Sequence, residues 1–156
     1  MLVRHDLEPW RLCLEVTENV MLEHAEAVAR SLHRLRRLGV RLSIDDFGAG
    51  YTSLSYLKRF PVDVLKIDRS FVTGICDQRE DAAIVSAVID LAHTFDTRTV
   101  AEGVEDAEQL AALVGMGCDY VQGFYFSEPL PSEEVAALLT TQRLRVTRPQ
   151  VPRPVA

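Results

Sequence analysis

The sequence lacks several features that assign proteins to a function class directly. It contains no glycine-rich phosphate loop, and its four histidines show no metal-ligand spacing. Its three cysteines, Cys13, Cys76 and Cys118, are odd in number and far apart. This argues against a disulfide framework and a zinc site, so we expect the cysteines to be small buried residues.

Positive charge and long apolar runs are also scarce. The chain has 17 Lys and Arg against 23 Asp and Glu, a net charge of −6, which argues against a nucleic-acid polymer or an anionic membrane surface as the main partner. Charges interrupt every apolar run before it reaches membrane-spanning length, and residues 1–10 lack the apolar core of a signal peptide. We therefore expect a cytoplasmic location and no membrane segment.

The size and patterning indicate one globular domain followed by a tail. With 156 residues and 47% hydrophobic content, the chain is long enough for one core. We expect a domain over residues 1–140, whose last helix starts at a cap near Ser132. Residues 141–156 are rich in arginine and proline and have no apolar period, which predicts a disordered tail.

Short apolar runs alternate with helical patterns along the domain. We expect strands at residues 10–16, 40–45, 62–67, 97–101 and 119–122, and helices at 25–39, 80–95 and 106–117. Repeated βα units imply an α/β protein with a parallel sheet.

Polar residues follow the carboxyl ends of these strands. An open sheet gathers its ligands at one switch point, whereas a barrel distributes them around one rim, as here. The chain is shorter than the roughly 250 residues of a complete barrel, so we expect a partial (β/α) barrel of about five units. The candidates are Glu15, Asp45, Asp46, Lys66, Glu102 and Gln122.

Three segments carry a family resemblance: LCLEVTENVML, LGVRLSIDDFGAGYTSLSYLKRFPVDVLKIDRSFV and TVAEGVEDAEQLAALVGMGCDYVQGFYFSEPLP. In order and spacing they resemble blocks of the EAL domain, the cyclic di-GMP phosphodiesterase family, over roughly residues 10–140. The match starts after the family's first barrel strands. The resemblance therefore implies a truncated domain, the C-terminal part of an EAL barrel, without the Glu-Ala-Leu strand and the asparagine-bearing strand.

The resemblance implies hydrolysis of cyclic di-GMP to linear pGpG with Mg²⁺ or Mn²⁺. It assigns metal binding to Glu15, Asp45, Asp46 and Glu102, and a place near the scissile phosphate and attacking water to Lys66. Asp46 and Glu102 act with Lys66 in catalysis on this assignment. The supporting positions are Glu18, Asp68, Glu105 and Gln122.

The residue chemistry is consistent with these roles. Carboxylates repel a dianionic substrate unless divalent cations reverse the local charge, and hard oxygen ligands suit Mg²⁺ or Mn²⁺. Gly48 and Gly50 permit a mobile loop over the site.

Each residue also has a purely structural alternative; Asp68, for example, could cap the segment that follows it. Phe124, Tyr125 and Phe126 could stack on a base, but we expect them to pack as part of an apolar barrel edge.

Absence of two ligand-bearing strands would leave an incomplete metal site and an exposed sheet edge. We therefore expect little turnover from the isolated chain, and a second chain or an upstream segment that completes the barrel. Two alternatives stay open: a non-catalytic module that binds cyclic di-GMP or a protein in bacterial signalling, and a remnant without function.

Overall fold

The computed structural model describes residues 2–17, 20, 25–48 and 57–141. The chain divides into two compact units, Met1–Phe126 and Ser127–Ala156, and each is described by itself. The expected tail lies almost wholly outside the described residues.

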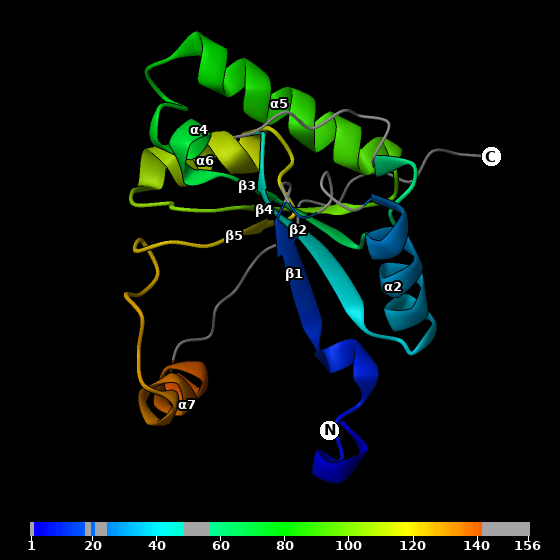
Figure 1. The fold of residues 1–156 in the computed structure, drawn as a ribbon. Helices are drawn as coiled ribbons and strands as arrows, with labels where there is room; N and C mark the ends of the chain where they lie inside the picture. The colour runs from blue at the N-terminus through cyan, green and yellow to red at the C-terminus, as the bar shows by residue number, and fades with distance from the viewer. Residues whose placement is uncertain (1, 18–19, 21–24, 49–56, 142–156) are drawn as a thin grey trace, which may run out of the picture. The chain divides into compact units, whose positions relative to one another are not determined.

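The first unit is a parallel sheet with helices packed against it (Figure 1). Its strands are β1 (Cys13–Thr17), β2 (Arg41–Phe47), β3 (Val64–Ile67), β4 (Arg98–Ala101) and β5 (Tyr120–Val121). Its α-helices are α2 (Ala25–Arg37), α4 (Arg69–Thr73), α5 (Arg79–Thr94) and α6 (Ala107–Gly115). Two short 3₁₀ helices, Val3–His5 and Pro9–Arg11, precede the sheet.

The five strands pair in the order β1-β2-β3-β4-β5, all parallel. Each strand lies beside its neighbour in the sequence, as repeated βα units require. Figure 1 shows α2, α5 and α6 on one side of this sheet. Among the described residues, β1 and β5 each pair on one side only. The expected α/β architecture with about five parallel units is confirmed.

The core lies between the two central strands and the helices. Leu42, Ile44, Leu65 and Ile67 are almost fully buried, and they pack in one cluster with the apolar face of α5. The alternate positions of β2 and β3 are also buried, because Ser43 is 2% and Lys66 8% exposed. Burial on both faces is typical of strands inside a parallel barrel. Polar residues therefore alternate with apolar ones in β2 and β3, although both faces of these strands are covered.

Several boundaries differ from the sequence prediction. Residues 10 and 11 belong to the 3₁₀ helix that starts at Pro9, because proline favours the first position of a helical turn, so β1 starts at Cys13. Strand β2 continues to Phe47 and contains both aspartates. Helix α4 was not predicted; Asp68 caps it by accepting a hydrogen bond from Ser70 N–H.

Two expectations about buried side chains were wrong. Cys13 and Cys76 are exposed, although all three cysteines are free thiols as predicted. Phe124 and Tyr125 are 62% and 44% exposed, so they are not buried at an apolar edge, although the Tyr125 ring contacts the Phe126 ring edge to face. Helix α6, in contrast, starts where the sequence indicates, because the Asp106 carboxylate accepts hydrogen bonds from Glu108 and Gln109 N–H.

A largely covered carboxylate, Asp119, joins the amino-terminal ends of β4 and β5. Asp119 accepts hydrogen bonds from Thr99 N–H at 3.0 Å and the Arg98 guanidinium at 2.7 Å, and it pairs with His93 Nε2 at 2.9 Å. Burial would raise the pKa of Asp119, but the bonds from Thr99, His93 and Arg98 outweigh burial and lower this pKa below its ordinary value. The folded state therefore favours the ionised carboxylate.

The hydrogen bonds of Asp119 predict that the stability of the fold decreases in acid. A carboxylate with a lowered folded-state pKa stabilises the fold above its unfolded pKa of about 4, and this contribution is lost as the pH falls through the folded value. Asp119→Asn should lower the free energy of unfolding by about 2 kcal/mol at pH 7 and should flatten its decline below about pH 4. Urea denaturation at several pH values measures both effects. An unchanged pH slope in the variant would contradict the assignment.

The second unit contains helix α7 (Ser132–Thr141), which starts at the expected residue. Within the described part of both units, no helix is long and apolar enough to cross a membrane.

Candidate active site

A buried lysine lies at the centre of the site. Its Nζ atom is 2.9 Å from Glu15 Oε2, 2.7 Å from Asp45 Oδ1 and 2.8 Å from Glu102 Oε1. The Lys66 side chain is 10% exposed, against 50% for Glu15, 24% for Asp45 and 19% for Glu102. Carboxylates from β1, from β2 and from the residue that follows β4 thus converge on one ammonium group.

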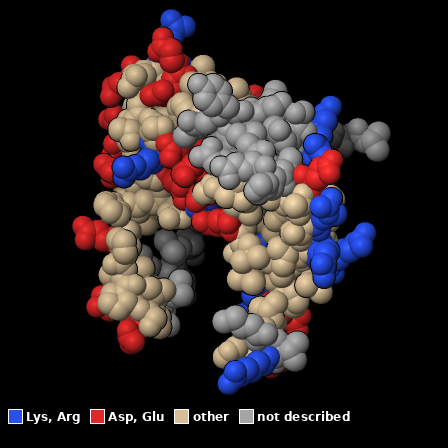
Figure 2. All heavy atoms as spheres, viewed as in Figure 1, with Lys and Arg blue, Asp and Glu red and all other residues tan. Residues whose placement is uncertain are grey.

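Strand register brings these side chains together. Glu15 is paired with Ser43 and Thr17 with Asp45, so Glu15 and Asp45 lie on the same face of β1 and β2. Lys66 is paired with Val100, which places Glu102 two residues further along the same face. Parallel strands present their carboxyl ends at one rim, as the sequence predicted. In Figure 2, acidic side chains gather near the centre of the view, and arginines lie along the side formed by α2.

Asp45 and Asp46 are adjacent in β2 and would normally point to opposite faces. The register of β2 against β3 shifts between Ile44 and Phe47, and Asp46 has a φ of 53°. This irregularity changes the direction in which the side chains at the end of β2 point. As a result, Asp45, Asp46 and Glu102 each offer an oxygen, and these oxygens lie within 4.8 Å of one another.

The charges of the site act on one another. Burial alone would lower the pKa of Lys66. Asp45, Glu102 and Glu15 accept hydrogen bonds from its ammonium group, and these bonds raise this pKa above its ordinary value. Reduced hydration, together with the charges of Asp45 and Asp68, raises the pKa of Asp46. The site therefore holds one stable cation among several acids, and its net charge is negative.

Helix α4 contacts Gly48, the residue that follows β2. The Asp68 carboxylate caps the helix, and hydrogen bonds from Ser70 lower the pKa of Asp68. Gly48, with a φ of 98°, faces the Phe71 ring, which would lie 3.1 Å from an added Cβ atom. Asp68 and Phe71 thus support both Asp46 and the glycine of the predicted loop.

The structure does not place every predicted residue in this cluster. Glu105 and Gln122 are exposed, and both contribute backbone groups. Glu105 N–H donates to Gln109 Oε1, Gln122 N–H donates to Ala101 O, and Gln122 O accepts from Val104 N–H. Glu18 and Gly50 lie outside the described residues. The roles of all these side chains remain predictions.

Sequence analysis missed two residues that position the loop after β4. Gln109, 7% exposed in α6, accepts a hydrogen bond from Glu105 N–H at 2.8 Å. Gly103 has a φ of 73°, and a Cβ atom there would lie 2.6 Å from Arg69 Cβ. A buried glutamine one helical turn after an N-cap was the available indication for the first of these contacts.

We expect Gln109→Leu to destabilise the protein by about 1–3 kcal/mol, because the Glu105 N–H would lose its partner beside the Glu102 loop. Gln109→Glu keeps the accepting oxygen and should retain the protection of this amide. Hydrogen exchange of the Glu105 amide and thermal unfolding test the pair of variants. Equal loss of amide protection in both variants would show that the oxygen is not the relevant group.

The donor set fits a divalent cation. Asp45, Asp46 and Glu102 provide closely spaced carboxylate oxygens, which are the ligands that Mg²⁺ and Mn²⁺ prefer. A single ammonium group faces three carboxylates, so an added cation offsets the remaining negative charge. Asp45 and Glu102 are also mostly buried, which strengthens their attraction for a cation.

Comparison with known proteins gives a consistent result. The family model described as "EAL domain" matches residues 1–129. The chain is 48% identical over 136 residues to the bifunctional diguanylate cyclase/cyclic di-GMP phosphodiesterase MucR of Pseudomonas aeruginosa, covering 87% of this chain and 20% of that protein. It is 45% identical over 152 residues to the cyclic di-GMP phosphodiesterase NbdA of the same species, covering 94% of this chain and 19% of that protein. The chain thus spans about a fifth of these relatives.

Solved structures show the same relationship. The P. aeruginosa MucR phosphodiesterase in complex with c-di-GMP superposes with a TM-score of 0.82 at 48% identity, covering 86% of this chain and 54% of that chain. The EAL domain of Mycobacterium smegmatis DcpA superposes with a TM-score of 0.84 at 43% identity, covering 89% of this chain and 62% of that chain. The five parallel strands correspond to part of the TIM barrel of these domains. This chain belongs to the EAL domain family.

Proposed function

We propose that this chain contributes the acidic rim of a metal-dependent site that hydrolyses cyclic di-GMP to linear pGpG. The observation that carries the proposal is the convergence of Glu15, Asp45 and Glu102 on Lys66, at distances of 2.7–2.9 Å. The similarity to MucR and NbdA, both described as cyclic di-GMP phosphodiesterases, supports the choice of substrate.

The acidic residues and the lysine have different roles in the proposed reaction. Asp45, Asp46 and Glu102 would hold the cations, with Glu15 at the outer side of the cluster. Bound Mg²⁺ or Mn²⁺ supplies Lewis acidity toward the phosphate and lowers the pKa of a coordinated water. Lys66, held in place by its carboxylate partners, would donate a hydrogen bond to a phosphate oxygen and offset charge that develops there. In the overall reaction, water adds across one P–O bond and the ring opens.

The first test is metal binding followed by hydrolysis. We expect Mn²⁺ binding, measured by calorimetry, to weaken by at least about tenfold in Asp45→Asn, because a buried ligand oxygen is lost. Asp90→Asn, the same change at an exposed position of α5, should leave it unchanged. Chromatography of cyclic di-GMP incubations should then show pGpG with Mn²⁺ and none with EDTA. A folded chain that binds neither Mn²⁺ nor cyclic di-GMP would refute the proposal.

The exposure of Glu15 favours a second candidate, binding of cyclic di-GMP without rapid hydrolysis. Glu15 is half exposed on β1, which pairs on one side only among the described residues. An open coordination shell binds Mg²⁺ weakly, because this ion gives up its water reluctantly. We therefore expect slow turnover by the chain alone. A rate of hydrolysis per chain that rises with protein concentration would indicate that a second copy completes the site. Metal-dependent binding of cyclic di-GMP without product would support the second candidate.

A further inference from the structure

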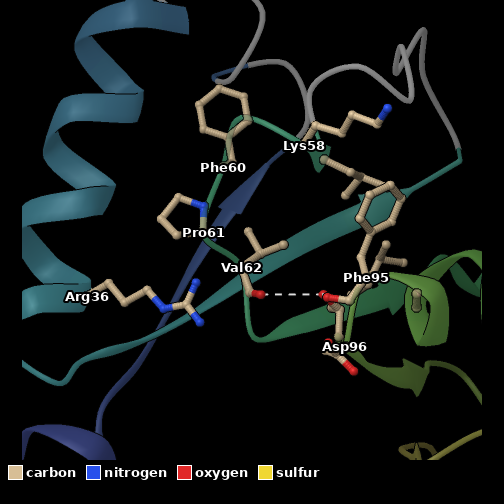
Figure 3. Close-up of a pocket in the computed structure, with 11 residues that line it drawn as sticks. Arg36, Lys58, Phe60, Pro61, Val62, Phe95 and Asp96 are labelled. Atoms are coloured by element: carbon tan, nitrogen blue, oxygen red, sulfur yellow. Dashed lines mark hydrogen bonds between the residues drawn. The ribbon is translucent and has the colours of Figure 1, made fainter.

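A cavity of about 390 Å³ lies at the amino-terminal end of β3, opposite the end that carries Lys66 (Figure 3). It is formed by the segment before β3, the end of α2 and the end of α5. None of the carboxylates of the candidate active site lines it. The volume falls in the range of small-molecule sites, about 300–1,000 Å³.

Apolar side chains form the inner part of the cavity wall, which reaches the core. Leu65 and Ala92 are 0% and 1% exposed and lie at its inner side, while the rings of Phe60 and Phe95 face the same space. An apolar surface of this shape would bury a single aromatic or branched aliphatic group.

Polar groups form the rest of the wall, and two of the three charged lining residues are cations. Arg36 extends from α2 toward Val62 in Figure 3, and among the described residues its guanidinium has one long ion pair, 3.6 Å to Asp63. Lys58 adds a second positive charge, and Asp96 is the one acid among the lining residues. A guanidinium held by one distant carboxylate keeps most of its donors available for a closer anion.

A buried hydroxyl provides a second polar contact. Thr97 is 4% exposed, and its Oγ1 lies 3.4 Å from Val62 O and 3.3 Å from Phe95 O. Both distances exceed the usual range of O–H···O hydrogen bonds, about 2.5–3.0 Å. The hydroxyl is therefore weakly bound within the protein and is able to turn toward a ligand oxygen.

We propose that this cavity binds a small monocarboxylate with an aromatic or branched apolar body. The body packs against Phe60, Phe95 and Ala92, and the carboxylate accepts hydrogen bonds from the Arg36 guanidinium and the Thr97 hydroxyl. Because the cavity and the acidic cluster lie at opposite ends of β3, both ligands can bind at the same time.

The test uses 3-phenylpropionate as the probe and 3-phenylpropan-1-ol as its uncharged analogue. Titration of the ¹⁵N-labelled chain should shift the amides of Val62, Ala92 and Thr97, with a Kd of about 1 mM or below for the acid and a weaker one for the alcohol. Arg36→Met should raise the Kd of the acid roughly fivefold to tenfold. Arg37→Met, the neighbouring exposed arginine of α2 outside the cavity, is the matched control and should not change it.

Ala92→Leu fills the cavity and supplies an independent variant. The Ala92→Leu chain should bind neither the acid nor the alcohol, and circular dichroism should show that this chain is folded. Failure of the unmodified chain to show shifts at the cavity amides would overturn the proposal. Equal effects of Arg36→Met and Arg37→Met, or equal affinity for the acid and the alcohol, would overturn the assignment of the carboxylate to Arg36.

Discussion

Lys66→Met is expected to improve metal binding and to abolish turnover. In the metal-free protein the Lys66 ammonium is the cation that balances Glu15, Asp45 and Glu102. A divalent ion must compete with this ammonium for the same oxygens. Removing the ammonium frees the carboxylates, so we expect Mn²⁺ to bind about threefold to tenfold more tightly by calorimetry. Hydrolysis of cyclic di-GMP, if the wild-type chain performs it, should fall at least about 100-fold, because the phosphate loses its fixed donor.

The same variant should be less stable without metal. Removal of one partner from a buried ion pair leaves uncompensated charge, which costs about 3 kcal/mol for a cluster that is part hydrated on the Glu15 side. Mn²⁺ should restore much of this loss, since it binds the folded state. The pKa of Lys66 is raised, so its contribution in the wild type is present below the unfolded value of about 10.4 and is lost only at higher pH.

Lys58→Met is the natural control, because Lys58 is the other lysine of the chain and is exposed. It should leave Mn²⁺ affinity and metal-free stability near the wild-type values. Weaker Mn²⁺ binding in Lys66→Met than in the wild type would mean that the lysine supports the ligands instead of competing with the ion. That outcome would contradict the electrostatic account given above.

The sequence predicts where the acids lie along the strands, but not how all of them reach one point. Glu15, Lys66 and Glu102 follow from strand order and period, because parallel neighbours expose the same face at the same rim. Asp46 does not follow, because an adjacent residue in a regular strand faces away. Its approach to Asp45 and Glu102 depends on the register shift before Phe47 and a φ of 53°, and neither has a local sequence indication as clear as a glycine.

Helix α4 shows a second limit of prediction. Five residues are too few for an apolar period, so the apolar pattern assigns no element to Arg69–Thr73. The structural alternative for Asp68, a helix cap, is correct, and the cap also brings Asp68 beside Asp46. Local capping and support of the site are therefore compatible roles of one residue. Conversely, the exposed positions of Cys13 and Cys76 depend on which neighbours cover them, which composition does not report.

Gly123→Ala is expected to have the largest effect on folding. Gly123 follows β5, and a Cβ atom built there would lie 2.1 Å from Val104 O and 2.3 Å from Val104 N. These are backbone atoms, so no side-chain rotation relieves the overlap. Two hydrogen bonds flank the contact, from Val104 N–H to Gln122 O at 3.0 Å and from Tyr125 N–H to Val104 O at 2.9 Å. The methyl group would separate the two segments and break both bonds.

We therefore expect Gly123→Ala to lower the free energy of unfolding by about 4 kcal/mol or more, from overpacking and the loss of two backbone hydrogen bonds. Gly115→Ala is the matched control, because its added Cβ meets no atom within 4 Å. Since alanine is the better helix former, the control should gain up to about 1 kcal/mol at the end of α6. Thermal and urea unfolding of the two variants provide the comparison.

Val104 lies two residues after Glu102, so any folded Gly123→Ala protein should also bind Mn²⁺ less tightly than the Gly115→Ala control. Similar stability of the two variants would show that the β4 and β5 loops can move apart freely, and that Gly123 does not fix the position of Glu102.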